Sequence, residues 1–262
     1  MTPSKPLFIL ALIAIITSSC NKVEKKAPCL PQGLGKSVVA FYTFSNGSLK
    51  DISGNNIDLS NSTTATETTD RDGNSNCAYL FDNLPTSSEF LTATNTTSLN
   101  NLDKFSVSLW YQPLDTSIDG RSLETLISRD TGSSCPNRNG QWSVGLYDCR
   151  KAVFGRTNSV WDENITNFDC KQEVIDRTDA WAHVVVTFKQ NGEEMKIYRN
   201  GVLQNSSTGT ATCNLGTPKT KDIGDLFLGK DYTGKIDDVI IFDKRLSQKE
   251  VKSLYDMETC CE

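Results

Sequence analysis

The chain has 262 residues, with 27 Lys and Arg against 32 Asp and Glu, and a formal net charge of −5. This length accommodates one large β-domain or two small ones once an export signal is removed. The acidic balance argues against a nucleic-acid partner and against a basic patch on a membrane surface.

Residues 1–19 have the features of an export signal. Lys5 supplies the positive charge, and the apolar stretch from Leu7 to Ile16 is too short to span a bilayer. The following Thr17-Ser18-Ser19-Cys20 resembles a bacterial lipobox, in which cleavage precedes a cysteine that becomes acylated, although Thr17 stands where Leu is usual. The alternative is an ordinary cleavable signal in which Cys20 is incidental. Lipidation at Cys20 predicts a protein anchored in the bacterial cell envelope, at the outer membrane, and leaves the periplasmic or surface face open.

Residues 20–36 carry Lys, Pro and Gly without periodicity, which predicts a tether, and residues 37–262 form the predicted domain. Residues 60–76 are rich in Ser, Thr and Asn and predict an exposed loop. The pair Asn200-Gly201 predicts a type I′ hairpin turn. Short apolar or alternating runs predict strands at Val38–Phe44, Cys77–Asp82, Glu89–Thr92, Phe105–Pro113, Leu126–Arg129, Trp142–Tyr147, Val153–Phe154, Trp181–Phe188, Lys196–Arg199, Val202–Leu203, Leu226–Gly229 and Gly234–Phe242.

The last of these strands organises the prediction. Gly234–Phe242 is apolar on both faces, which indicates a strand between two layers, and the front of the domain is expected to fold back onto it. Alternation places Asp237 and Asp238 on opposite sides, and a buried carboxylate there needs a cation or a set of donors. Ser247 and Glu250 form a capping-box pattern, which predicts a short helix.

About a dozen short strands, one terminal helix and no βαβ alternation predict an all-β fold. The expected architecture is a two-sheet antiparallel jelly-roll sandwich with one short C-terminal helix.

Eight cysteines remain besides Cys20, and an even number in an exported chain predicts disulfides. If the chain ends meet, Cys29 and Cys77 are the expected partners of Cys260 and Cys261. The expected bonds in the middle loops are then Cys135–Cys149 and Cys170–Cys213.

Seven motifs follow one another along the chain: Phe41-Tyr42-Thr43-Phe44, Asp51-x-Ser53-Gly54-Asn55, Ala78-Tyr79-Leu80-Phe81-Asp82, Phe105-x-Val107-Ser108-x-Trp110, Trp181-x-His183-Val184-x-Val186-Thr187, Ile197-Tyr198-x-Asn200-Gly201 and Gly234-x-Ile236-Asp237-Asp238-Val239. In this order they resemble the bacterial laminin-G-like domains, which belong to the concanavalin A-like lectin/glucanase sandwiches. The resemblance covers roughly residues 37–256. It departs from the family at Ile240, where Arg is usual, and in the four extra cysteines between 135 and 213.

The resemblance implies binding of carbohydrate or protein, often with a structural calcium ion near the loop at residues 51–56. Calcium prefers carboxylate, amide and backbone oxygens. Asp51, Asn55 and Asp237, with Asp238 as a substitute, are the implied ligands. The alternative is that Asp51 and Asn55 form the turn and Asp237 accepts backbone hydrogen bonds.

Sugars stack on exposed aromatic rings beside hydrogen-bonding side chains. Trp161, flanked by Asp162 and Asn164, is the best exposed candidate, so these three are the predicted ligand-binding residues; a Trp that fills a loop is the alternative. Trp110 is expected in the core, and Tyr147 is ambiguous.

A catalytic reading is poorly supported. Glu173, Asp176 and Asp179 faintly resemble the carboxylates of a glucanase strand, but their spacing does not place them on one face of a strand. The sole histidine, His183, is expected to form a structural hydrogen bond. We therefore expect a monomeric, lipid-anchored, non-catalytic module that binds a polysaccharide or glycoprotein. The alternatives are a structural or adhesion module for a neighbouring envelope protein and, less favoured, a glycoside hydrolase.

Overall fold

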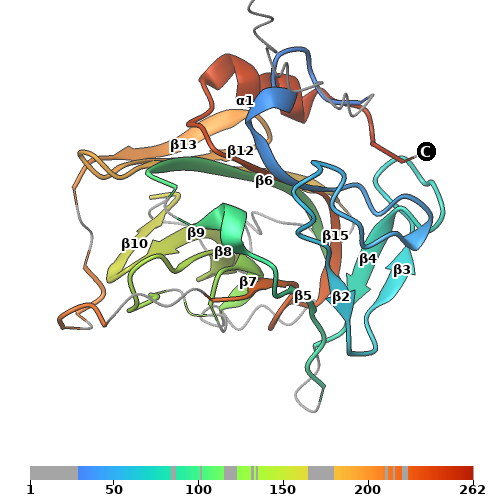
Figure 1. Cartoon of the computed structure of the whole chain (residues 1–262), viewed down its shortest axis with the longest axis horizontal. Helices are drawn as coiled ribbons and strands as arrows, with labels where there is room; N and C mark the ends of the chain where they lie inside the picture. Colours follow the sequence, from blue (N-terminus) through green and yellow to red (C-terminus); the bar gives the residue numbers. More distant parts are fainter. Residues whose placement is uncertain are drawn as a thin grey trace, which may run out of the picture.

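The computed structural model describes residues 29–83, 87–100, 102–114, 123–130, 133, 135–164, 180–209, 212–214, 216–219 and 224–261. Two antiparallel sheets stack face to face, and one short helix lies over the upper sheet (Figure 1). The predicted all-β sandwich with a single C-terminal helix is confirmed.

The upper sheet, sheet A, has eight strands. Seven follow the order β13-β12-β11-β6-β15-β4-β3, and β1 pairs with β15 beside this path. The strands are β1 (Val38–Tyr42), β3 (Thr66–Thr68), β4 (Ala78–Phe81), β6 (Lys104–Pro113), β11 (Ala182–Lys189), β12 (Glu194–Arg199), β13 (Val202–Ser207) and β15 (Gly234–Phe242).

The lower sheet, sheet B, has seven strands in the order β10-β9-β8-β7-β14-β5-β2. They are β2 (Ser60–Asn61), β5 (Leu91–Ala93), β7 (Glu124–Ser128), β8 (Trp142–Tyr147), β9 (Lys151–Arg156), β10 (Ser159–Asp162) and β14 (Leu226–Leu228). Short 3-10 turns are η1 (Gly35–Ser37), η2 (Ser45–Gly47) and η3 (Thr97–Leu99).

The front and rear of the domain pair as expected. β1 runs antiparallel to β15, with Val38 opposite Phe242 and Tyr42 opposite Val239. Alternation then divides the side chains of β15 between two cores. Val239 and Ile241 face the main core between the sheets, whereas Ile240 and Phe242 face a second core on the outside of sheet A. A strand that is buried on both sides explains the continuous apolar run in the sequence.

The helix α1 (Gln248–Tyr255) covers the outer face of sheet A (Figure 1). It begins with the predicted capping box, because the Ser247 side chain accepts from the Glu250 backbone N–H and the Glu250 carboxylate accepts from the Ser247 backbone N–H. Val251 and Leu254 are buried in the second core. The helix therefore seals a sheet face that would otherwise expose apolar side chains.

Disulfides fasten the chain ends to the domain. Cys29 bonds to Cys260 and Cys77 to Cys261, as expected. The pairing expected in the middle is wrong, because Cys135 bonds to Cys213 across 78 residues of sequence. Cys149 is also disulfide-bonded, while Cys170 lies outside the described residues.

Three segments differ from the sequence-based prediction. The polar stretch at residues 60–76 is not all loop, since it contributes β2 and β3, which are mostly exposed edge strands. β10, in the polar segment after Phe154, also went unpredicted. The rear of the predicted tether packs on the domain, where Leu34 is buried in the second core.

The export signal and Cys20 lie outside the described residues. Within the described ranges, no helix is both long enough and apolar enough to cross a bilayer.

Candidate functional site

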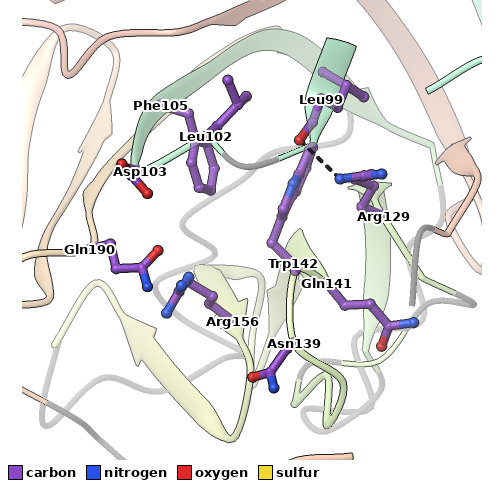
Figure 2. A pocket seen from close by; sticks show the side chains of 11 residues that line it. Leu99, Leu102, Asp103, Phe105, Arg129, Asn139, Gln141, Trp142, Arg156 and Gln190 are labelled. Carbon is purple, nitrogen blue, oxygen red and sulfur yellow. Dashed lines mark hydrogen bonds between the residues drawn. The ribbon is translucent and has the colours of Figure 1, made fainter. Parts of the chain in front are cut away.

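The first pocket opens at one end of the sandwich, between the two sheets, and we call it the inter-sheet pocket (Figure 2). Its volume is about 450 Å³. The start of β6 and Gln190, which follows β11, lie on the sheet A side, and the start of β8 and the end of β9 lie on the sheet B side. It is lined by Leu99, Leu102, Asp103, Phe105, Arg129, Asn139, Gly140, Gln141, Trp142, Arg156 and Gln190.

The two rings that line the inter-sheet pocket are buried, whereas Asp103, Asn139 and Gln190 are exposed. Phe105 and Trp142 are buried with their centroids 5.6 Å apart. The Arg129 side chain is buried as well, donating to the Leu99 carbonyl at 2.9 Å and to Asn100 Oδ1 at 2.6 Å. The sequence prediction did not single out this pocket, because its residues come from five separate segments.

A second pocket, the β10 pocket, has a volume of about 710 Å³ and lies where the edge strand β10 of sheet B approaches the edge strand β13 of sheet A. All three residues predicted to bind a ligand, Trp161, Asp162 and Asn164, line it. The remaining lining residues are Cys135, Tyr147, Val153, Val160, Asn205, Ser206 and Ser207.

The prediction that Trp161 is exposed is wrong. The ring is 4% exposed and stacks on Phe154, with centroids 5.7 Å apart and an interplanar angle of 15°. The cause is the strand β10, in which alternation turns Trp161 toward the core and Asp162 outward. The exposed ring of this pocket is Tyr147, with 41% of its surface exposed.

A buried ion pair holds the predicted residues in place. Glu163 stands between Asp162 and Asn164, is 1% exposed, and accepts from Arg199 at 2.8 Å (Nε) and 2.5 Å (Nη2). Its Oε2 also accepts from the Ala152 backbone N–H at 2.7 Å. A bidentate, buried guanidinium–carboxylate pair fixes orientation as well as distance. It therefore positions the two neighbouring polar side chains at the edge of the pocket.

Further hydrogen bonds rigidify the rim of the β10 pocket. Asp162 Oδ1 accepts from the Asn164 backbone N–H at 2.7 Å, and the Asp162 carbonyl accepts from Asn205 Nδ2 at 2.5 Å. The second bond links sheet B to sheet A. Asp162 keeps a half-exposed carboxylate, whose Oδ2 lies 3.7 Å from Lys151 Nζ.

The carboxylates of the C-terminal strand form a buried cluster around an arginine. Arg71 Nη1 lies 2.8 Å from Asp237 Oδ2 and 2.7 Å from Asp238 Oδ2. The same guanidinium donates to the Met257 carbonyl at 3.1 Å and lies 4.6 Å from the centre of the Trp110 ring. Arg71 is therefore the cation that the sequence analysis required but did not name.

The prediction that Asp237 and Asp238 face opposite sides is wrong. The register of β15 against β6 shifts between Asp237 and Ile240, and Asp238 has φ = 42°, in the left-handed region. Such a bulge breaks the alternation of side chains. Both carboxylates therefore reach one guanidinium.

Electrostatics in this cluster favour the neutral form of the acids. Burial, followed by the neighbouring Asp238 carboxylate, raises the pKa of Asp237 well above its usual value. Burial raises the pKa of Asp238 to about 6, although Arg71 opposes the rise. Asp238 Oδ1 is buried, and within the described chain it accepts no hydrogen bond. Burying such an oxygen costs less free energy when the carboxyl is protonated and therefore uncharged.

The loop at residues 51–56 is satisfied from within. Asp51 Oδ1 accepts from the backbone N–H groups of Phe41 (3.0 Å) and Ser53 (2.9 Å), and Oδ2 accepts from the Ile57 N–H at 3.1 Å. Asn55 donates its amide to the Val39 carbonyl at 2.8 Å. This is the turn-forming role that the sequence analysis gave as the alternative.

These contacts bear on the predicted calcium ligands. Within the described part of the chain, the one group of three His, Cys, Asp or Glu side chains with ligand atoms within 4.8 Å of one another is Asp70, Cys77 and Cys261. Two of these are joined in a disulfide and offer no thiolate. Asp51, Asp237 and Asp238 form no such group, and all of their carboxylate oxygens except Asp238 Oδ1 accept hydrogen bonds from protein donors. Calcium takes about six to eight oxygen ligands, and its binding at these residues stays a prediction that the described contacts do not favour.

The sole histidine is a core residue. His183 Nε2 lies 2.8 Å from Ser108 Oγ, and the imidazole packs 4.9 Å from the Trp110 ring. Burial, with a smaller contribution from Arg71, lowers the pKa of His183 to about 3. The imidazole also packs against Tyr255 of α1, with ring centroids 6.1 Å apart, so its described contacts are those of a structural residue. The carboxylates considered for hydrolysis, Glu173, Asp176 and Asp179, lie outside the described residues.

With this geometry in hand, comparisons place the chain in a family. A family model described as the concanavalin A-like lectin/glucanases superfamily matches residues 85–252, which is more than half of the sequence. The chain belongs to the concanavalin A-like lectin/glucanase superfamily. The resemblance inferred from the motifs is confirmed at this level. No curated protein sequence matches this member of the superfamily.

Solved structures with the same fold include three binding domains. The botulinum neurotoxin serotype D binding domain superposes with a TM-score of 0.62 at 17% identity, over 85% of this chain and 52% of that one. The binding domain of botulinum neurotoxin DC, in complex with rat synaptotagmin II, gives 0.61 at 19% identity with the same coverage. The binding domain of Paraclostridial Mosquitocidal Protein 1 also gives 0.61 at 19% identity, over 85% and 52%. This superfamily member thus spans about half the length of these chains, and the likeness establishes the fold.

Proposed function

We propose that this chain is a non-catalytic binding module that takes a carbohydrate, free or on a glycoprotein, in the β10 pocket. The observation that carries the proposal is the exposed ring of Tyr147 beside the half-exposed carboxylate of Asp162 and the polar side chains of Asn164, Asn205 and Ser206. An aromatic face next to carboxylate, amide and hydroxyl groups is the chemistry that sugar rings require.

The distribution of apolar surface supports sugar over a protein partner. Five large hydrophobic side chains are exposed among the described residues: Ile52, Leu114, Tyr147, Val202 and Leu203. Val202 and Leu203 are neighbours, while the other three come from separate segments. A protein interface usually presents a broader apolar centre. Tyr147 is the one aromatic among the five, and it lies in a pocket.

The named properties of proteins with the same fold agree with this proposal. The superfamily is named for lectins and glucanases. One structure of this fold is a neurotoxin binding domain bound to synaptotagmin II, and another concerns a type C neurotoxin whose cell entry depends on two ganglioside molecules. These are properties of those proteins, and they motivate a glycan screen of this one.

A glycan array on the full chain tests the proposal. We expect binding to a restricted set of glycans, a loss of about tenfold in Tyr147→Ala, and retention in Tyr147→Phe, which keeps the ring. Val202→Ala, an exposed apolar truncation outside the pocket, is the matched control. Equal binding by wild-type protein and Tyr147→Ala at every glycan, or no binding to any glycan, would contradict the proposal.

We further propose that the chain is exported, lipid-anchored through Cys20 and monomeric in the bacterial envelope. The disulfides Cys29–Cys260, Cys77–Cys261 and Cys135–Cys213 are compatible with an oxidising compartment. Labelled palmitate should enter the wild-type protein and not Cys20→Ser. Equal labelling of both proteins would contradict the proposed lipid anchor at Cys20.

A further inference from the structure

We propose that the inter-sheet pocket is a second binding site, which takes a ligand bearing a carboxylate and several hydroxyl groups, with Arg156 as its carboxylate-binding residue. The two pockets have no lining residue in common. The inference therefore does not depend on sugar binding in the β10 pocket.

Arg156, the last residue of β9, is the feature that points to a ligand. Its side chain is 18% exposed, and its five N–H donors make no hydrogen bond within the described part of the chain. Its charged neighbour is Glu193, whose Oε1 lies 3.8 Å from Nη1. That separation is too long for a hydrogen bond. The guanidinium also packs 4.4 Å from the centre of the Phe188 ring, which fixes its position.

The electrostatic state of Arg156 agrees with this geometry. Burial lowers the pKa of Arg156, and the charge of Glu193 only partly offsets the effect. The guanidinium stays protonated at neutral pH. A largely buried cation without a hydrogen-bonded counter-ion gains free energy when an anion binds to it.

Other polar groups of the pocket are also free to bind. The side chains of Asp103, Asn139, Gln141 and Gln190 line the pocket, and over the described ranges none of them makes a hydrogen bond. Figure 2 shows Asp103, Gln190 and Arg156 grouped on one side of the pocket, with Trp142 and Arg129 on the other. Each amide offers donors and an acceptor, which is the complement of a hydroxyl group.

The choice of a carboxylate follows from the shape and charge of this set. A planar guanidinium pairs with a carboxylate through two parallel hydrogen bonds. Asp103 is exposed at the rim and accepts from hydroxyl groups, while Arg129 adds a second buried positive charge. A pocket of about 450 Å³ is in the range that holds small ligands. A sugar acid of one or two rings meets these requirements.

The test uses one array that carries neutral, carboxylated and sulfated glycans, probed with the full chain. We expect carboxylated glycans to bind, Arg156→Gln to weaken that binding about tenfold, and Arg156→Lys to weaken it less. Lys50→Gln, which removes one exposed positive charge on a distant loop, is the charge-matched control and should bind normally. Gln190→Ala, at an exposed pocket residue, should weaken the same signals without lowering the melting temperature.

The outcomes separate the two pockets. Signals lost in Arg156→Gln and retained in Tyr147→Ala belong to the inter-sheet pocket, and the reverse pattern belongs to the β10 pocket. The inference fails if carboxylated glycans do not bind, or if Arg156→Gln and Gln190→Ala bind them as tightly as the wild-type chain does. It also fails if the chain binds sulfated and neutral glycans on the array as tightly as carboxylated ones. A lower melting temperature in Arg156→Gln with unchanged binding would make Arg156 a packing residue on Phe188 and overturn the inference.

Discussion

Replacing Arg71 with Met would leave two carboxylates buried without their cation. Asp237 and Asp238 are each 1% exposed, and Arg71 Nη1 contacts both within 2.8 Å. Methionine keeps an apolar stem against Trp110 and removes the charge. Breaking a buried ion pair from one side costs about 3–5 kcal/mol. A loss of this size is a large fraction of the stability of a typical domain, about 5–15 kcal/mol.

The sign of the pH dependence follows from the raised pKa values. A carboxyl whose pKa is higher in the folded state than in the unfolded state holds its proton longer when folded. For Asp238, with a folded pKa of about 6, the contribution to stability falls as the pH rises toward that value. Arg71 limits this fall in the wild-type protein. The penalty of Arg71→Met should therefore be largest at neutral pH and smaller near pH 4, where both acids are protonated in either variant.

Urea unfolding, followed by circular dichroism without reductant, measures this penalty. We expect Arg71→Met to lose about 3–5 kcal/mol at pH 7.5 and clearly less near pH 4. Adding Asp237→Asn and Asp238→Asn to Arg71→Met should restore most of the loss. Lys50→Met, which removes an exposed ion pair with Asp58, should cost less than about 1 kcal/mol. A loss below about 1 kcal/mol in Arg71→Met at pH 7.5, or an equal loss at both pH values, would refute the reasoning.

Three other expectations follow from the structure. As the only histidine, His183 should show imidazole ¹⁵N shifts of a neutral ring from pH 8 to pH 5, and a titration near pH 6.5 would contradict its burial. Gly201→Ala should lower the free energy of unfolding by about 1–2 kcal/mol or more, because φ is 76° and the new Cβ would lie 3.2 Å from Tyr255 Cβ in α1. Gly209→Ala, at φ = 85° with no atom within 4 Å of the new Cβ, should lower it less. Equal losses in the two variants would show that the contact with α1 adds nothing. EDTA and calcium should leave the melting temperature unchanged, since Arg71 neutralises the acids of the C-terminal strand; a calcium-dependent rise would restore the predicted metal site.

The elements predicted correctly are those in which local pattern and tertiary role agree. β15 is apolar on both faces because it lies between two cores, so its sequence is read correctly as a buried strand. The capping box of α1 is likewise a local signal. β2 and β3 went unpredicted because they are short, mostly exposed strands whose pairing with β5 and β4 is set by distant residues.

The site residues follow the same division. Asp162 and Asn164 were predicted to bind a ligand and do line a pocket, but the exposed ring is Tyr147, from β8. Trp161 faces the core because side chains alternate along β10, and the sequence analysis predicted a polar segment there and not a strand. Arg71 and Arg156 were not predicted because their contacts are with residues far away in sequence: Asp237 and Asp238 for Arg71, and Phe188 for Arg156. The bulge at Asp238 has no local signature, since the left-handed backbone there is imposed by the neighbouring strands.

Calorimetric titration of the strongest glycan whose array signal Arg156→Gln retains tests the central claim most directly. The account predicts one molar equivalent bound per β10 pocket in the wild-type protein, and a dissociation constant raised about tenfold in Tyr147→Ala with no change in melting temperature. An unchanged dissociation constant in Tyr147→Ala would contradict the assignment of the β10 pocket as the carbohydrate site.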